Sequence, residues 1–488
     1  MVESLTSGIN PKRLFLGSCF ALIATSVAFA MVGAVMGPLK EVFILTNEQI
    51  GWIGGAGLWG FPITIMILGP LVDIIGMRLL LRVSLLFHFT GTLLMITANG
   101  FWMLFGGAMI IAMGNGIVEA VCNPLVATAY PDRKTEMLNK FHVWFPGGIV
   151  IGGLIAYVFG LIGLNWQVTL AIILIPASIY GVIFTGQLFP ATESKQIGVS
   201  FGQMFKETLF RPLFVVLAFS IVFTASLELG PNRWIPAVLT SAGMPGILVL
   251  VWISLIMAVL RYFAGPLVQR FKPTGLLLGS ALFGGLGLFW LSYADTFLQA
   301  IVASTVFAVG VCYCWPTLLG ITSERVPKGG PMALAWMSGV GMLTVGLITS
   351  PLMGWVADKQ SHQRLPFQQT LLLMDQGKTV LNSAVADAPV SRQIAIRGTL
   401  ALIDDVLGSA TEESLPEITT ANALRSLINI DPTSPVAKQA QALLAPAENF
   451  GGKRSFRFLA PFSLIPILIF GFIYFRDRRR GGYQVEKL

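Results

Sequence analysis

Three polar side chains stand four residues apart in an otherwise apolar stretch of the sequence. In GNGIVEAVCNPLV, residues 114–126, they are Asn115, Glu119 and Asn123. A spacing of four places them on one face of a helix. A carboxylate can alternate between a protonated and an ionised form, and an amide can hydrogen-bond to hydroxyl groups. The three residues could therefore bind a polyhydroxylated solute and a proton together, or they could form a structural hydrogen-bonding staple between helices.

A second carboxylate, Glu228, lies in the apolar stretch ASLELGPNRWIP, residues 225–236. We expect it to be a further candidate for proton coupling. Gly230 and Pro231 follow it directly, and proline removes a helical hydrogen bond. The pair predicts a break in the helix, as suits a segment that bends during gating.

Candidate solute-binding residues follow in the same stretch and later in the chain. Asn232 could bind hydroxyl groups, and the indole rings of Trp234 and Trp315 could support the face of a sugar ring. Each tryptophan could instead be an anchor at the membrane interface.

Arg261 and His142 are two further titratable residues near the predicted spans. We expect Arg261 to form an ion pair with Glu119 that breaks when a proton binds, although it could simply extend to the lipid headgroups. His142 could help a proton to leave the site, or it could be an ordinary interfacial histidine.

The elements that hold these residues are predicted from composition. The 488 residues are 55% hydrophobic and only 11% charged, whereas an average soluble domain is about 25% charged. Apolar runs long enough to cross a bilayer recur along the chain, which predicts an all-helical membrane protein with twelve spans. The predicted spans are 14–36, 51–72, 79–98, 101–128, 143–163, 167–188, 212–234, 247–268, 274–293, 296–320, 332–356 and 457–475.

The positions of Lys and Arg predict the orientation, because these residues collect on the cytoplasmic side. We expect a multi-pass protein of the cell (inner) membrane with both termini in the cytoplasm. The formal charge of +8 then reflects topology and not nucleic-acid binding. The predicted inner segments hold Lys12, Arg13, Arg78, Arg82, Arg133, Lys134, Lys140, Lys195, Lys206, Arg211, Arg270, Lys272, Arg325, Lys328, Arg476, Arg478, Arg479, Arg480 and Lys487, and the short outer loops hold only Lys40 and Arg233.

An internal repeat divides the chain into two parts. GPLVDIIGMRLLL at 69–81 resembles GPLVQRFKPTGLLL at 265–278, 196 residues later, and CNPLV at 122–126 resembles CWPTL at 314–318. Two repeated six-helix halves are typical of one large class of transporters. The predicted parts are 1–190 as the first half, 191–211 as a cytoplasmic linker, 212–356 with 455–476 as the second half, and 477–488 as a cytoplasmic tail.

The loop after the second span resembles the signature G-x-x-x-D-x-x-G-x-[R/K] of the major facilitator superfamily. Here its residues are Gly69, Asp73, Gly76 and Arg78. We expect Gly69 to allow close helix packing, and Asp73 to lie at the N-terminus of helix 11, where the helix dipole favours an anion. In the second copy Gln269 and Arg270 replace the acid, so this gating contact is expected on one side only.

The resemblance implies a transporter in which helices 1, 4, 7 and 10 line the pathway. It is narrower for the sugar permeases around the fucose:proton symporters, which are similar in having G-x-G-x-x-E, N-P and L-N-x-x-H. The corresponding residues are Gly114, Gly116, Glu119, Asn123, Pro124, Leu138, Asn139 and His142. That branch also has an acidic residue in helix 1, and span 14–36 has none, so the coupling ion stays open.

Residues 357–454 interrupt the second half between helices 11 and 12, and the topology predicts that they lie outside the cell. Apolar residues at helical spacing predict a small helical bundle, and its charges nearly cancel. It could be a passive cap, or a module that binds a partner or captures the solute. The apolar positions are Ile394, Leu400, Ile403, Val406, Leu407, Leu424, Leu427 and Ile428.

We therefore predict a monomeric, proton-driven importer of a sugar or polyol, with no cofactor and no enzymatic activity. The alternatives are an exporter, a sodium-coupled carrier of another small solute, and a sensor that signals through its outer insertion. The cysteines predict neither a disulfide framework nor a metal site, because all lie within spans and no acid or histidine cluster accompanies them. They are Cys19, Cys122, Cys312 and Cys314.

Overall fold

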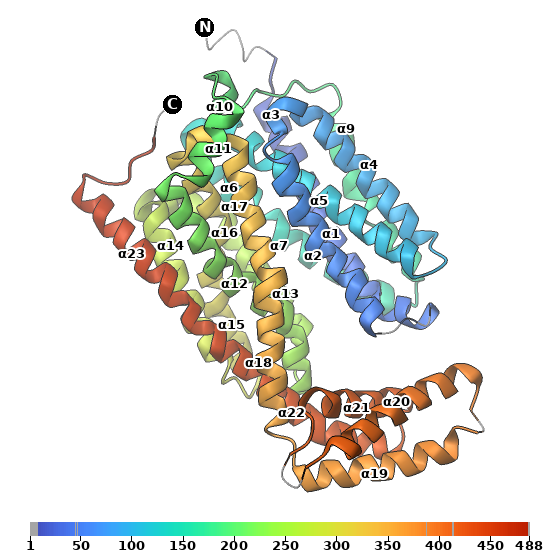
Figure 1. Cartoon of the computed structure of the whole chain (residues 1–488). Helices are drawn as coiled ribbons and strands as arrows, with labels where there is room; N and C mark the ends of the chain where they lie inside the picture. Colours follow the sequence, from blue (N-terminus) through green and yellow to red (C-terminus); the bar gives the residue numbers. More distant parts are fainter. Residues whose placement is uncertain (1–7, 44, 46, 387, 412–413, 487–488) are drawn as a thin grey trace.

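The computed structural model describes residues 8–43, 45, 47–386, 388–411 and 414–486. Every regular element among them is a helix, which confirms the predicted all-helical class. Lys487 and residues 1–7, which the predicted topology includes, lie outside the described residues. Figure 1 shows two groups of long helices side by side and a smaller bundle of helices at one end.

The first group, the N half, holds the six predicted spans of residues 1–190. A short helix stands between the second and third spans, and the sixth span is divided into two helices. The elements are α1 (Pro11–Val42), α2 (Asn47–Leu68), α3 (Val72–Ile75), α4 (Met77–Ile96), α5 (Phe101–Ala129), a 3-10 turn (Pro131–Arg133), α6 (Lys134–Phe141), α7 (Trp144–Leu161), α8 (Trp166–Ala171) and α9 (Leu174–Phe184).

The linker and the second group, the C half, follow. The linker forms α10 (Glu193–Gln196) and α11 (Phe201–Leu209). The C half contains α12 (Pro212–Ser241), α13 (Gly246–Tyr262), α14 (Ala264–Leu291), α15 (Phe297–Val311), α16 (Cys314–Arg325), a 3-10 turn (Pro327–Gly329), α17 (Gly330–Thr344), a π-helical segment (Val345–Thr349), α18 (Ser350–His362), the second part of α22 (Pro435–Leu459), a 3-10 turn (Ala460–Ser463) and α23 (Leu464–Arg479).

These helices account for the twelve predicted spans. Among the described residues, eleven helical segments are long and apolar enough to cross a membrane, and the 17-residue α13 is a shorter apolar helix. The predicted eighth span, 247–268, extends too far, because α13 ends at Tyr262 and α14 begins at Ala264. The predicted break at Gly230 and Pro231 is also wrong, since α12 continues through both residues.

Figure 1 places the start of α1, the end of α23 and the linker helices at one end of the molecule, and the small bundle at the other. We call these the terminal end and the bundle end. An even number of crossings returns the chain to the side on which it began, so this arrangement is the one that twelve spans require.

The sequence repeat has a counterpart in the backbone. Gly76, which separates α3 from α4, has φ 94° and ψ 138°. Lys272, 196 residues later, has φ 60° and ψ 158° and interrupts α14. Such angles are almost exclusive to glycine. The second copy of the repeat therefore keeps the helix break of the first copy. The two copies of the signature differ in their side chains more than in their backbone.

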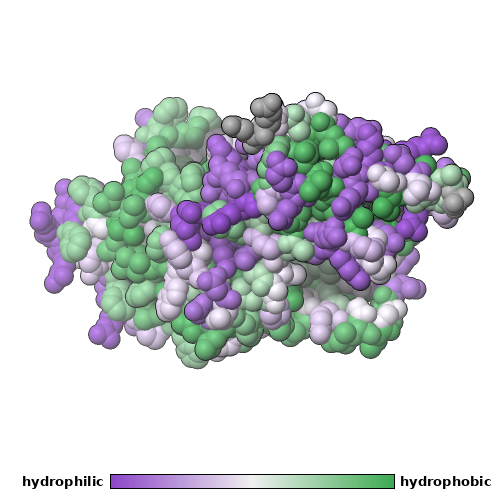
Figure 2. Space-filling view, turned by 90° about the horizontal axis from the view of Figure 1, so that it is seen from below, coloured by the Kyte–Doolittle hydropathy of each residue, from purple (hydrophilic) through white to green (hydrophobic). Residues whose placement is uncertain are grey.

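The insertion forms the predicted helical bundle. Its elements are α19 (Phe367–Ala384), α20 (Val390–Ser409), α21 (Glu417–Ile430) and the first part of α22. Leu373, Ile403 and Leu424 belong to a buried core of its own, whereas Ile394 is 70% exposed, contrary to prediction. The predicted limits, 357–454, fall within helices, because α18 continues to His362 and α22 runs from Pro435 to Leu459. Figure 2 looks onto the bundle end and shows hydrophilic residues gathered across it.

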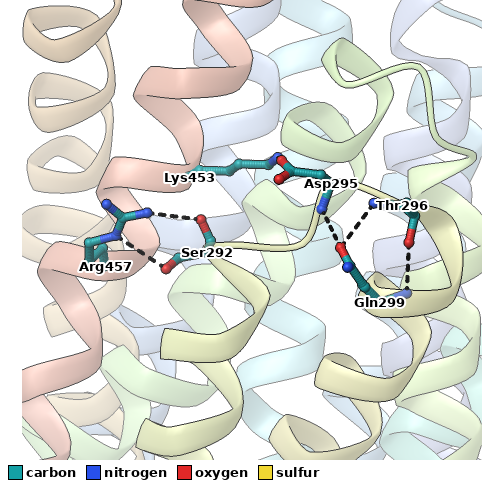
Figure 3. Close-up of polar contacts among 6 residues, drawn as sticks. All are labelled: Ser292, Asp295, Thr296, Gln299, Lys453 and Arg457. Carbon is teal, nitrogen blue, oxygen red and sulfur yellow. Dashed lines mark hydrogen bonds and ion pairs between the residues drawn. The ribbon is translucent and has the colours of Figure 1, made fainter.

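Polar contacts attach the second part of α22, which continues from the bundle, to the loop between α14 and α15 (Figure 3). The Nζ atom of Lys453 in α22 lies 2.8 Å from Oδ1 of Asp295, in the loop between α14 and α15. One turn later, Arg457 donates 3.2 Å to the carbonyl of Ser292, and its guanidinium lies 3.7 Å from the ring centroid of Tyr293. The bundle is therefore expected to move with the C half.

Candidate functional site

A central cavity lies between the two halves. Four aromatic side chains, one leucine and one methionine form its apolar wall, and four titratable side chains share its lining. The residues are Phe29, Phe61, Glu119, His142 and Phe145 from the N half and Glu228, Leu229, Arg261, Trp315 and Met342 from the C half. The sequence prediction identified Glu119, His142, Glu228, Arg261 and Trp315, and the structure brings these five together.

Glu119 lies in the middle of α5 and is only 3% exposed. The Nδ2 group of Asn123, one turn later, donates to its Oε2 atom at 2.6 Å. The Nε2 atom of His142 lies 3.0 Å from Oδ1 of Asn123 and 4.0 Å from Oε2 of Glu119. His142 is 2% exposed and so is no interfacial histidine. The side chain of Asn123 therefore orients both Glu119 and His142.

Arg261 pairs with the carboxylate of the C half. Its Nη2 atom lies 2.8 Å from Oε1 of Glu228, so the predicted ion pair of Arg261 with Glu119 is wrong. Arg261 is also only 2% exposed, which excludes the alternative that it extends to headgroups. Burial of an arginine in a spanning segment requires such a counter-charge.

Two backbone carbonyls complete the shell of Arg261. Its Nε donates to the carbonyl of Cys312 at 2.5 Å, and its Nη1 donates to the carbonyl of His142 at 3.0 Å. In a continuous helix these carbonyls would accept from the N–H groups of residues 316 and 146. Both of those residues are prolines, which have no N–H. Pro146 and Pro316 therefore leave two free acceptors, and Arg261 fills both.

Arg261 consequently connects the halves. It belongs to α13 of the C half, whereas His142 caps α6 of the N half. The buried chain of groups runs from Glu119 through His142 and Arg261 to Glu228. The sequence reasoning missed the role of the carbonyls, although a proline four residues after each of them was a readable signal.

The remaining predicted binding residues divide between two locations. The Oδ1 atom of Asn115 accepts from Nε2 of His88 at 2.8 Å, and Asn115 lines a second cavity on the bundle side of the first. Trp234 packs against Gly354 of α18 and the core of the C half. Neither Trp234 nor Asn232 is among the residues that line these two cavities, so their contact with the solute stays a prediction.

The halves pack closely together at the terminal end. Oε1 of Glu324, at the end of α16, accepts hydrogen bonds from the N–H and the hydroxyl of Thr135 at 3.1 and 2.7 Å. Thr135 lies in the first turn of α6, where the helix dipole favours an anion. A carboxylate therefore caps a helix of the opposite half, and it is Glu324 at α6; Asp73 makes no direct hydrogen bond to α17, the predicted helix 11, among the described residues.

Asp73 binds the linker instead. Its carboxylate accepts from the hydroxyl of Thr192 at 2.7 Å and from that of Ser194 at 3.3 Å. Burial raises the pKa of Asp73, and the hydroxyl of Thr192 and the charge of Lys195 oppose that rise. Arg78 likewise donates to the carbonyl of Gln187. Asp73 thus holds the linker at the terminal end, and Arg78 holds the segment just before it.

The two glycines of the signature provide a matched pair of tests. A Cβ atom at Gly69 would lie 2.0 Å from Cβ of Ala335 in α17, whereas one at Gly76 would meet nothing within 4 Å. Gly69→Ala is expected to force the halves apart at the terminal end, while Gly76→Ala costs about 1–3 kcal/mol of local stability through its positive φ alone. Double electron–electron resonance between spin labels on the two halves checks this. Equal distance distributions for both variants would contradict it.

The C-terminal tail folds back onto Glu324. The hydroxyl of Tyr483 donates to Oε2 of Glu324 at 2.6 Å, and the guanidinium of Arg325 lies 4.1 Å from the ring centroid of Tyr483. Burial raises the pKa of Tyr483 far above its usual range, so its hydroxyl stays a donor. The tail holds the carboxylate that joins the two halves.

Truncation after Arg480 is therefore expected to loosen the terminal end. A cysteine at Leu334, which is 4% exposed in α17, should react several-fold faster with a water-soluble maleimide in the truncated protein. The native cysteines are buried and contribute little background. Tyr483→Phe should act in the same direction but more weakly, and an unchanged labelling rate would show that the tail does not hold this contact.

Comparisons with known proteins agree with this architecture. The family model of the Major Facilitator Superfamily matches residues 15–343, more than half of the chain. The gentisate transporter of Corynebacterium glutamicum is 23% identical over 419 residues, 80% of this chain and 92% of that protein. The D-xylose transporter of Levilactobacillus brevis is 27% identical over 175 residues, 36% of this chain and only 37% of that protein.

A solved structure shows the same fold. The structure of the E. coli fucose:proton symporter aligns with a TM-score of 0.59 and 18% identity, covering 71% of this chain and 92% of that chain. The resemblance to the superfamily that the sequence motifs indicated is thereby confirmed: this chain belongs to the major facilitator superfamily and is a multi-pass membrane transporter.

Proposed function

We propose that this protein imports a small polyhydroxylated solute, a sugar or a polyol, together with protons by alternating access. One observation carries the proposal: each half contributes a buried carboxylate, Glu119 or Glu228, to one cavity between them. Intramembrane acids of this kind typically mark proton relays. The D-xylose transporter and the fucose:proton symporter named above support the choice of solute.

The solute would bind in the central cavity against Trp315. Its indole edge contacts α17 at Gly341, and an aromatic wall suits the apolar face of a sugar ring. Because Asn123 is hydrogen-bonded to Glu119 and His142, solute hydroxyls that compete for these groups would change the environment of the coupling carboxylate. Solute binding and protonation would then favour one another, as a symporter requires.

Alternating access would exchange closure at one end for closure at the other. We take the terminal end as cytoplasmic, following the basic residues of the loops. The described state then has its cytoplasmic end closed by Glu324 with Thr135 and by Gly69 with Ala335. Opening that end must also break the bond of Arg261 to the carbonyl of His142. A proton on Glu228 would weaken its ion pair with Arg261 and so lower the cost of that step.

Ligand-induced thermal shifts test the choice of solute. The purified protein is heated with a panel of sugars and polyols at pH 5.5 and pH 7.5. We expect at least one of them to raise the melting temperature, and to raise it more at the lower pH because the protonated site binds it more tightly. A panel without any pH-dependent shift would argue against proton-coupled sugar binding.

Removal of the bundle distinguishes a carrier from a sensor. The bundle has a core of its own and joins the C half through α18 and α22. Replacing residues 364–434 by a short flexible linker should therefore leave solute uptake at a substantial fraction of the wild-type rate. Complete loss of uptake in a variant that still folds and reaches the membrane would assign the bundle an essential role.

A further inference from the structure

The second cavity, which we call the outer vestibule, contains an arginine without a partner. It has a volume of about 220 Å³, and Phe29 lines both it and the central cavity. Its polar lining is Asn115 and Arg233, and the rest is glycine and apolar side chains. Among the described residues Arg233 makes no hydrogen bond or ion pair, whereas Asn115 is bonded to His88. The vestibule therefore presents one free positive charge along the route to Arg261.

The charges along the two cavities depend on protonation. The carboxylates are Glu119 and Glu228, and the permanent cations are Arg233 and Arg261. With both carboxylates ionised the charges balance. With both protonated, two cations face the cavities without a counter-charge. Arg233 is exposed, but Arg261 is buried, and a buried cation without a partner is strongly unfavourable.

The geometry around Glu228 shows where a replacement charge would bind. Arg261 uses Nε and Nη1 for the two carbonyls, and only Nη2 reaches Glu228. The Oε2 atom of Glu228 is buried and has no hydrogen-bond partner among the described residues. The other titratable groups around Glu228 are Glu119, His142, Cys312 and Cys314, and none of them is a cation with a permanent charge.

We propose that the transported solute carries a carboxylate, as a sugar acid does, which first meets Arg233 and then takes the place of Glu228 on Nη2 of Arg261. When Glu228 holds the coupled proton, the solute carboxylate restores the counter-charge of Arg261. When Glu228 releases the proton, its carboxylate forms the ion pair with Arg261 again and the solute dissociates. This inference rests on the proposed proton-coupled function and specifies the chemical class of its solute.

Matched pairs of ligands test it. Melting temperatures are measured at pH 5.5 for the wild type and for Glu228→Gln, which imitates the protonated residue. The ligands are D-glucuronate against D-glucose, D-galacturonate against D-galactose, and acetate against acetamide. We expect the acid of a pair to bind at least about tenfold more tightly than its neutral partner, and the difference to be larger in Glu228→Gln.

Variants of Arg233 test the vestibule. Arg233→Gln should weaken binding of the acid several-fold and reduce its dependence on ionic strength, while Arg233→Lys should retain both. Arg82→Gln is the control, because Arg82 is an exposed arginine of α4 that lines neither cavity. If no acid stabilises Glu228→Gln more than its neutral partner, the inference is overturned.

A failure of this inference can be distinguished from a failure of the proposed function. Proton-driven uptake of a neutral sugar, with no response to its acid, would overturn the inference and leave the symport intact. Accumulation that does not depend on the pH gradient would overturn the symport, whatever the charge of the solute.

Discussion

Glu119→Gln is expected to abolish accumulation of the solute driven by a pH gradient while leaving exchange across the membrane largely intact. The amide imitates the protonated carboxyl in size and keeps a partner in Asn123, whose side chain lies 2.6 Å away. It cannot release a proton, so the cycle with bound solute still runs but no longer couples to the gradient. Exchange of radiolabelled solute in proteoliposomes, with and without an imposed gradient, measures the two activities.

A matched control is available in the linker. Glu207 pairs with Arg211 at the terminal end, and Glu207→Gln should change neither activity. Gradient-driven uptake by Glu119→Gln at the wild-type level would show that the glutamate is a structural staple. Loss of both accumulation and exchange in a folded variant would equally contradict its assignment as a coupling group.

Arg261→Met is expected to have the largest effect on stability. It leaves Glu228 without its counter-charge at a site where both side chains are almost fully buried, and it frees two buried carbonyls. Removing one partner of a buried ion pair typically costs about 3–5 kcal/mol. We expect a marked fall in the melting temperature of the purified protein and loss of transport.

The double variant Arg261→Met with Glu228→Gln separates charge from packing. Without the carboxylate no buried charge remains unpaired, so part of the lost melting temperature should return. Transport should not return, because the carbonyls of His142 and Cys312 still lack the donor that connects the halves. Equal melting temperatures for the single and the double variant would show that the ion pair contributes little.

Helix content and the candidate carboxylates could be predicted from the sequence. Long apolar runs leave few alternatives in a bilayer, and an acid such as Glu119 within one of them is costly unless it faces a cavity. The offset of 196 residues between Gly69 and Gly265 located the repeat, and the glycine-like break at Lys272 shows that the repeat extends to the backbone.

Pairings between distant segments could not be predicted in the same way. Arg261 is equally compatible by sequence with Glu119 or Glu228, and only the packing of α12 against α13 decides for Glu228. Asp73 was predicted to lie at the N-terminus of the eleventh span, which is α17, but its carboxylate accepts a hydrogen bond from the hydroxyl of Thr192 in the linker. The sequence of the linker does not reveal that it folds back onto Asp73.

Proton movement caused by the solute tests the central claim most directly. The purified protein is reconstituted into liposomes that contain a pH-sensitive dye, and a saturating solute from the thermal-shift panel is added outside without any imposed gradient. We predict acidification of the lumen that follows solute entry in the wild type and is absent in Glu119→Gln. Solute entry into wild-type liposomes at the same rate, with no change in lumenal pH, would contradict the account.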